Sequence, residues 1–167
     1  SNCTLCALGE FNTDHGQAKC SQCSRGTFGN ATGLTTTCPG CPIGKFQSLP
    51  GMSFCELCPA GEFNPSPSQP NCGNCPAGNF INVNGSSECL PCAAGSAQSL
   101  NGQTRCNNCT AGQFTSNPGQ ASCSLCQPGK ATAQHGAQSC TDCASGKYQD
   151  QPGHANCTAC ARGTFNP

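Results

Sequence analysis

Cysteine is the residue whose number and spacing in this chain point most clearly to chemistry. The 20 cysteines among 167 residues form ten C-x-x-C pairs, from Cys3 and Cys6 to Cys157 and Cys160. Such pairs can form redox-active thiols, zinc sites or structural disulfides. The arrangement of the pairs along the chain discriminates among these three uses.

The pairs recur every 17 residues, with a single 18-residue step between Cys20 and Cys38. A thiol oxidoreductase needs one such motif on a βαβ frame, and zinc-ribbon sites usually come singly. Five four-cysteine zinc sites are the alternative interpretation, but the uniform interval favours structural disulfides. We therefore expect no bound metal and no cofactor.

The other residues suited to catalysis are too dispersed to form a catalytic centre. His15 and His135 share one repeat position, and His154 lies elsewhere. The seven carboxylates are spread at one or two per repeat, without the pairing that acid–base catalysis requires. We expect that the chain is not an enzyme.

The composition excludes an ordinary hydrophobic core. Leu, Ile, Val and Phe number only 19 of 167 residues, below the ~20% that globular chains need, so cross-links must replace the core. Seven basic and seven acidic residues leave no charge excess for nucleic acid or an anionic membrane. No apolar run approaches the ~20 residues of a membrane span, and no leader opens the sequence. We expect a segment of a mature, oxidised extracellular or cell-surface protein of the secretory pathway.

Glycines and aromatic residues share the cysteine period. A glycine lies three residues after the second Cys of every pair, and an aromatic residue follows two positions later except at Ala97 and Ala131. A second glycine lies ten residues after the same Cys, except where Ser68 replaces it. Dipeptides such as Pro50-Gly51 and Asn84-Gly85 are typical of tight turns with positive φ. Each repeat is therefore predicted to be a small hairpin or looped ribbon with its turn near the second glycine and its aromatic residue packed on neighbouring disulfides.

Three regular disulfide patterns are compatible with these pairs. A bridge within C-x-x-C closes a very small loop and is more often reactive than structural. A bridge from the second Cys of one pair to the first of the next encloses 13 residues in most repeats, including the turn. This loop-closing pattern is favoured, while linking like positions (Cys3 to Cys20 and Cys6 to Cys23) stays open.

The pattern C-x-x-G-x-[FY]-x(4)-G-x(3)-C-x-x-C resembles the cysteine-rich repeats of Eph receptors and of many protist surface antigens. It is also similar to the first submodule of tumour necrosis factor receptor repeats, in which the loop-closing bridge is the rule. The resemblance covers the whole chain and implies an extracellular module used in receptors, coats and fibres alike. The predicted disulfides are Cys6–Cys20, Cys23–Cys38, Cys41–Cys55, Cys58–Cys72, Cys75–Cys89, Cys92–Cys106, Cys109–Cys123, Cys126–Cys140 and Cys143–Cys157, with Cys3 and Cys160 left to pair outside this window.

The predicted fold is small and disulfide-rich, an elongated linear array of 17-residue β-hairpin or loop repeats with almost no helix. Residues 1–167 are expected to form one continuous array of about nine C-x2-C-x13 repeats, a window of a longer array with no separate globular domain. Each repeat should touch only its neighbours.

The expected function is a structural segment of an extracellular, glycosylated, disulfide-laddered filament, appendage or surface coat. Its expected partners are copies of itself or further repeats of the same chain. The alternative is a ligand-binding or adhesion stalk of a cell-surface receptor. A receptor is expected to interrupt the repeat with a longer charged or aromatic loop, yet the loops differ in length by one residue at most.

Five N-x-[ST] sequons predict covalent glycans. Asn30 and Asn84 lie in predicted loops, where access is easiest. In the other three a cysteine occupies the middle position, which should slow glycan addition. The predicted glycosylation sites are Asn2, Asn30, Asn84, Asn108 and Asn156.

Disulfide stabilisation predicts opposite responses to a chelator and to a reductant. A bridge closing a ~15-residue loop contributes roughly 3 kcal/mol in the chain-entropy model, so a thiol reductant should abolish the circular dichroism signal and the protease resistance. Excess EDTA should leave both unchanged, because no metal is expected to hold the fold. Loss of structure on chelation alone would favour the zinc interpretation.

Overall fold

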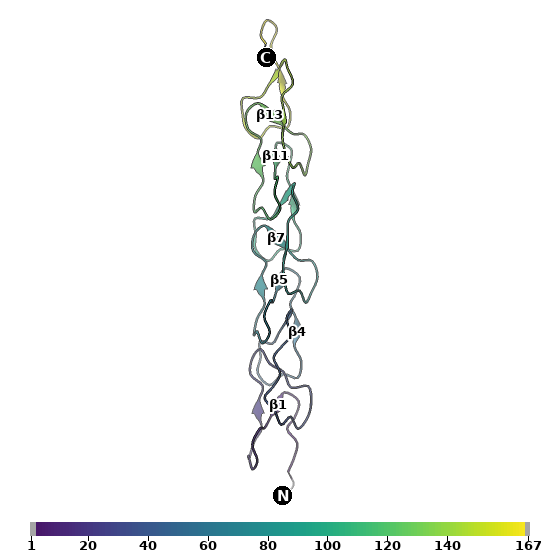
Figure 1. The fold of residues 1–167 in the computed structure, drawn as a ribbon, viewed down its shortest axis with the longest axis vertical. Coiled ribbons are helices and arrows are strands. Elements are labelled where there is room, and N and C mark those ends of the chain that lie inside the picture. The colour runs from purple at the N-terminus through teal and green to yellow at the C-terminus, as the bar shows by residue number, and fades with distance from the viewer. Residues whose placement is uncertain (1–2, 166–167) are drawn as a thin grey trace. The chain divides into compact units, whose positions relative to one another are not determined.

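The computed structural model describes residues 3–165, which contain short strands and loops but no helix (Figure 1). Each strand is two residues long, because the disulfide-bounded repeat leaves little room for a longer ladder. The strands are β1 (Glu10–Phe11), β2 (Ser21–Gln22), β3 (Lys45–Phe46), β4 (Glu56–Leu57), β5 (Glu62–Phe63), β6 (Gly73–Asn74), β7 (Asn79–Phe80), β8 (Leu90–Pro91), β9 (Ser96–Ala97), β10 (Asn107–Asn108), β11 (Gln113–Phe114), β12 (Ser124–Leu125), β13 (Lys130–Ala131), β14 (Thr141–Asp142), β15 (Lys147–Tyr148) and β16 (Thr158–Ala159).

Consecutive strands pair antiparallel into two-stranded hairpins, which confirms the predicted repeat fold. The first strand of each hairpin follows the first glycine and ends at the aromatic position. The second strand is the pair of residues inside the next C-x-x-C, so that in β1–β2 Phe11 lies opposite Ser21. In the repeat with the inserted residue, a single bridge between Thr27 and Gly40 takes the place of this strand pair.

The second glycines adopt the positive φ that the turn dipeptides predict, and the first glycines, for which no conformation was predicted, share it. All 18 glycines on the repeat have φ between +67° and +90°, a region that side chains with a Cβ rarely enter. Ser68 has φ +61° and is the non-glycine residue with positive φ in the described part of the chain. It occupies the second-glycine position of its repeat, so the turn keeps its geometry despite the substitution.

The chain divides into two compact units, Ser1–Cys75 with Ile81–Cys89, and Pro76–Phe80 with Leu90–Pro167. Both are built from loops closed by disulfides, which we number loop 1 (6–20) to loop 9 (143–157) in chain order. Adjacent loops within a unit share a backbone hydrogen bond. The second-glycine N–H donates to the carbonyl of the cysteine that opens the preceding loop, as from Gly51 to Cys23 and from Gly136 to Cys109, both at 2.8 Å.

Loops also contact the next loop but one, so the prediction that each repeat touches only its neighbours is wrong. A Cβ built on Gly95 in loop 6 would collide with the carbonyl oxygen of Gly136 in loop 8. Gly44 of loop 3 meets the Gly85 carbonyl of loop 5 in the same way. The first glycine therefore has two functions, since it provides positive φ and also leaves space for the backbone of a loop two positions further on.

Ser68 is accommodated by a second departure from the repeat, a glycine at position 40, immediately before the cysteine that opens loop 3. The residue before each opening cysteine lies beside the second glycine of the following loop, as Leu57 lies beside Gly85 and Leu125 beside Gly153. Beside Ser68 the corresponding residue is Gly40, and a Cβ on Gly40 would collide with the Ser68 hydroxyl. The serine side chain thus occupies space that a larger residue fills in the other repeats.

The interior consists mainly of sulfur and backbone. The cysteines that open loops 2 to 8 are 0–1% exposed, and several first glycines are buried beside them. The residues at the aromatic repeat position from Phe11 to Phe114 are half-buried where they are phenylalanine, while Tyr148 and Phe165 are exposed. Cysteine and glycine therefore provide the buried layer that apolar side chains provide in a larger domain.

Two alanine substitutions isolate the contribution of the next-but-one contact. Gly95 and Gly129 have φ of +86° and +82°, but a Cβ on Gly129 meets nothing within 4 Å, because these 167 residues include no loop two positions beyond loop 8. Both substitutions should cost about 1–2 kcal/mol of backbone strain. Gly95→Ala should cost a further ~1–3 kcal/mol, because the collision with Gly136 forces the backbones apart.

Hydrogen exchange of matched amides measures this difference. Cys109 N–H donates to the Gly95 carbonyl at 2.9 Å, and Cys143 N–H donates to the Gly129 carbonyl at 2.8 Å. We expect exchange at Cys109 in Gly95→Ala to accelerate at least about fivefold more than exchange at Cys143 in Gly129→Ala, the equivalent of ~1 kcal/mol. Equal acceleration at the two amides would show that the next-but-one contact contributes no stability.

Candidate functional site

Nine disulfides each join the second Cys of one C-x-x-C pair to the first Cys of the next pair. They join Cys6–Cys20, Cys23–Cys38, Cys41–Cys55, Cys58–Cys72, Cys75–Cys89, Cys92–Cys106, Cys109–Cys123, Cys126–Cys140 and Cys143–Cys157. Their Cα–Cα distances lie between 5.6 and 5.8 Å, within the usual range for disulfides. Cys3 is exposed and Cys160 is half-buried, and both are unpaired among the described residues.

Buried glutamine side chains brace three of the loops from within. Gln98 is 4% exposed, and its Nε2 donates to the Arg105 carbonyl at 2.8 Å while its Oε1 accepts from Leu100 N–H at 3.1 Å. Gln47 and Gln149 make the equivalent pair of bonds in loops 3 and 9. Each glutamine thus joins the start of a loop to the residue that precedes its closing cysteine.

Shorter polar residues at the same position bind the preceding loop instead. Asn64 Nδ2 donates to the Lys45 carbonyl at 2.8 Å, and Thr115 Oγ1 accepts from Gly95 N–H at 2.8 Å. This buried position, six residues after the opening cysteine, was not predicted from the sequence. The available signal was the recurrence of Gln, Asn or Thr immediately after the aromatic position.

The four described sequon asparagines all lie at the surface. Asn30, Asn84, Asn108 and Asn156 are exposed, and Asn2 lies outside the described residues. Asn108 also lies beside the turn at Gly136, since its Cγ is 3.7 Å from where a Gly136 Cβ would be. Asn84 is more strongly anchored, because its Oδ1 accepts a hydrogen bond from Ala60 N–H in the preceding loop at 2.9 Å.

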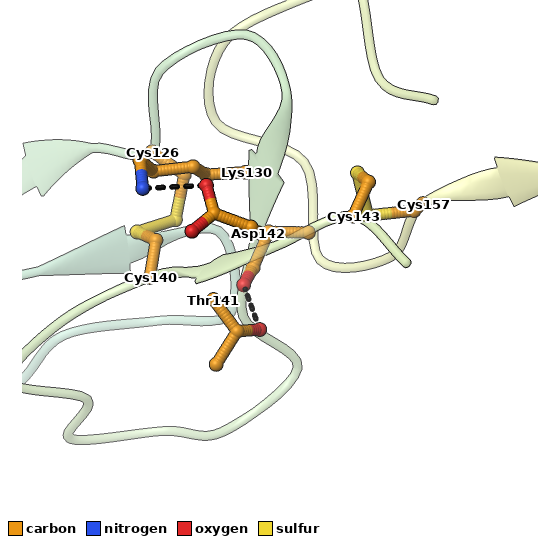
Figure 2. Close-up of polar contacts among 8 residues, drawn as sticks. Cys126, Lys130, Cys140, Thr141, Asp142, Cys143 and Cys157 are labelled. Atoms are coloured by element: carbon orange, nitrogen blue, oxygen red, sulfur yellow. Dashed lines mark hydrogen bonds and ion pairs between the residues drawn. A yellow bond between two sulfur atoms is a disulfide. The ribbon is translucent and has the colours of Figure 1, made fainter. Parts of the chain in front are cut away.

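One ion pair joins the two strands of the loop 8 hairpin (Figure 2). Lys130 Nζ lies 2.6 Å from Asp142 Oδ1, and the two residues are direct cross-strand partners in β13–β14. Thr141 Oγ1 in the same hairpin donates to the Ala131 carbonyl at 3.0 Å. The Asp142 side chain is 80% exposed and that of Lys130 is 44% exposed, so solvent screens the pair and it contributes little to stability.

The histidines and carboxylates are not brought together by the fold. His15, His135 and His154 are all exposed. No group of three or more His, Cys, Asp or Glu side chains is arranged to hold a metal ion within residues 3–165. The same residues contain no helix long and apolar enough to cross a membrane. What the loops bring together is a set of disulfides, backbone hydrogen bonds and surface asparagines.

Two overlapping segments, residues 95–143 and 135–167, match the family model described as tyrosine-protein kinase ephrin type A/B receptor-like. They contain the same cysteine and glycine spacing and the same disulfide ladder as the rest of the chain, with alanine at two of the aromatic positions, Ala97 and Ala131. Residues 95–167 are thus similar to the cysteine-rich repeats of ephrin receptors. No curated protein matches the chain. This similarity and the extensive disulfide bonding fit an extracellular receptor-like or surface domain.

Removal of a buried glutamine amide tests whether this position braces the ephrin-receptor-like loop. Gln98→Ala leaves the Leu100 N–H and the Arg105 carbonyl without their partner, and the loss of each part-buried hydrogen bond should cost about 0.5–1.5 kcal/mol. We expect hydrogen exchange at the Leu100 amide to accelerate about tenfold or more. Gln120→Ala is the control, because this exposed side chain should change stability by no more than about 0.5 kcal/mol. Unchanged exchange at Leu100 would contradict a bracing role for Gln98.

Proposed function

We propose that these repeats form a structural segment of an extracellular, glycosylated filament, appendage or surface coat. The observation that supports this function is the contact of each loop with the next two loops within a unit, through adjacent bonds such as Gly51 to Cys23 and next-but-one contacts such as Gly9 with Gly51. A loop that contacts both the adjacent loop and the next loop but one cannot move independently of either. Such restricted motion suits a structural component.

The disulfides make each loop resistant to extension. Every bridge connects residues 14 or 15 positions apart whose Cα atoms lie under 6 Å from each other. A tensile force along the chain therefore passes through the bridge, and the loop residues cannot be drawn out. Opening one bridge would release about 45–50 Å of chain, so the intact ladder limits extension to the two-residue connections between loops.

The surface supports association with further copies or further repeats. Charged residues make up 8% of the sequence and the formal net charge is zero, a combination that favours association over dispersal. Leu49, Val83 and Leu100 share one repeat position and are 54–62% exposed. The two-residue strands also leave hydrogen-bonding edges that another chain can use. Contacts between copies would then be small and repeated.

A receptor or adhesion ectodomain is the second candidate, and the match of residues 95–167 to the ephrin-receptor-like family model favours it. Under this proposal the repeats would be a stalk, or would bind a ligand through side chains on several loops. The regular loop length gives no single loop an enlarged binding surface. We therefore place the structural role first.

Electron microscopy of the native, purified material separates the two proposals. The structural role predicts filaments or ordered coats that survive EDTA and disperse after reduction and alkylation, because reduction opens the loops that form the contacts. The matched control is the same sample alkylated without reductant, which should keep its assemblies. A protein that stays monomeric at high concentration and binds one soluble ligand with defined stoichiometry would support the receptor role instead.

A further inference from the structure

The sequon Asn84-Gly85-Ser86 is anchored to the preceding loop by all three of its residues. Asn84 Oδ1 accepts from Ala60 N–H at 2.9 Å. Gly85 N–H donates to the Cys58 carbonyl at 2.7 Å, and the Ser86 carbonyl accepts from Asn64 N–H at 3.0 Å. Asn84 nevertheless remains exposed, and its Nδ2 makes no hydrogen bond to the described residues.

These contacts separate the two ends of the Asn84 amide. The oxygen is fixed to the loop 4 backbone, whereas the nitrogen, which is the atom that an N-linked glycan uses, is free. An amide is planar because its C–N bond has partial double-bond character. Fixing Oδ1 therefore also fixes the direction in which a substituent on Nδ2 leaves the protein.

We propose that Asn84 carries an N-linked oligosaccharide whose first sugar is held in a fixed orientation by the hydrogen bond between Asn84 and Ala60. The inference rests on the secretory-pathway location that the proposed function requires. It names one sequon as an oriented attachment point, whereas Asn30 is exposed with no hydrogen bond from its side chain to the described residues.

The transfer reaction leaves Asn84 Oδ1 able to accept this hydrogen bond when the loops dock. Nδ2 bonds to the anomeric carbon of an oligosaccharide donor carried on a polyprenyl diphosphate, and the bond from that carbon to the phosphate oxygen breaks. The polyprenyl diphosphate leaves with the electron pair, and Nδ2 loses one of its two protons to a base of the host transferase. Oδ1 keeps its lone pairs, so it can still accept from Ala60 N–H.

The anchoring also determines when the sugar is added. A transferase has to bind the Asn-x-Ser segment, whose backbone in the folded chain is already bonded to Cys58 and Asn64. Addition to Asn84 therefore precedes the docking of loop 5 on loop 4. Mild reductant during synthesis, which delays closure of Cys75–Cys89, should raise the occupancy of Asn84.

Asn101 is an unmodified counterpart in the same chain. Its Oδ1 accepts from Ala77 N–H at 2.9 Å, and Gly102 follows with φ +69°, as Gly85 follows Asn84. Gln103 stands where a sequon needs Ser or Thr. Gln103→Ser therefore places a sequon on an asparagine with the same backbone contact.

Ala60→Pro removes the donor without changing the turn. Glu62 N–H donates to the Pro59 carbonyl at 3.0 Å, and Gly61 has φ +90°, which is the geometry of a type II turn with Ala60 at its second position. Proline is favoured at that position. The substitution keeps the sequon and deletes the Ala60 N–H that holds Asn84 Oδ1.

The test uses the full chain made in a glycosylating host, with site occupancy measured by mass spectrometry after enzymatic deglycosylation. Relaxation of the acetamido N–H of the first sugar then reports its mobility. We expect a glycan at Asn84 with an order parameter near that of rigid backbone, about 0.85, falling below ~0.6 in Ala60→Pro. Ser86→Ala should lose the glycan and keep the fold, and Gln103→Ser should gain a second ordered sugar at Asn101.

Two results would overturn the inference. The first is an unmodified Asn84 in a chain that is secreted and folded. The second is a sugar at Asn84 that is as mobile in the parent chain as in Ala60→Pro. Either result leaves the structural role intact, because that role is judged by the presence of filaments or coats in native material. Absence of such assemblies with an ordered glycan at Asn84 would instead reject the structural role alone.

Discussion

The disulfide at each loop closure is the interaction on which the other contacts depend. Its opening cysteine is almost fully buried in loops 2 to 8, so the bridge is both the cross-link and the centre of the interior. Closing the loop brings its two ends together, which sets the short hairpin and positions the second glycine for its bond to the preceding loop. Without the bridge, one half-buried aromatic residue per repeat could not offset the chain entropy lost on folding.

An interior of sulfur and backbone contains buried backbone N–H and carbonyl groups that need hydrogen-bond partners. A core of apolar side chains adds no such groups. The loops are too short to satisfy their carbonyls and N–H groups in regular strands, so buried side-chain amides supply the missing partners. Gln98 does this within its own loop, and Asn64 does it across to the preceding loop. No buried side-chain nitrogen or oxygen is left without a partner in residues 3–165. Side-chain length decides whether the amide braces one loop or joins two.

The local design of the repeat was predictable because it is repeated many times within one sequence. Eight recurring second glycines and their turn dipeptides identify the loop tip and its positive φ. The contact between Gly95 and Gly136 was not predictable, because the recurrence of the first glycine does not reveal which loop lies against it. The buried role of Gln98 was missed for a related reason, since a polar residue next to a half-buried aromatic suggests a surface position. Surface exposure of Asn84 could be expected from the sequence, but its bond to Ala60 could not, since that bond depends on how two loops stack.

The pairing of Ser68 with Gly40 limits how such an array can change during evolution. Repeated genes gain and lose units by unequal crossing-over, which treats the units as interchangeable. Most boundaries here would tolerate such an exchange, because a glycine turn meets a residue such as Leu57 or Leu125. An exchange that placed a leucine beside Ser68 would force two side chains into the space of one. Gly40, which precedes loop 3, and Ser68, which lies in loop 4, therefore have to be inherited together. The cysteine spacing of loops 3 and 4 gives no sign of this constraint, because it is the same as in most other loops.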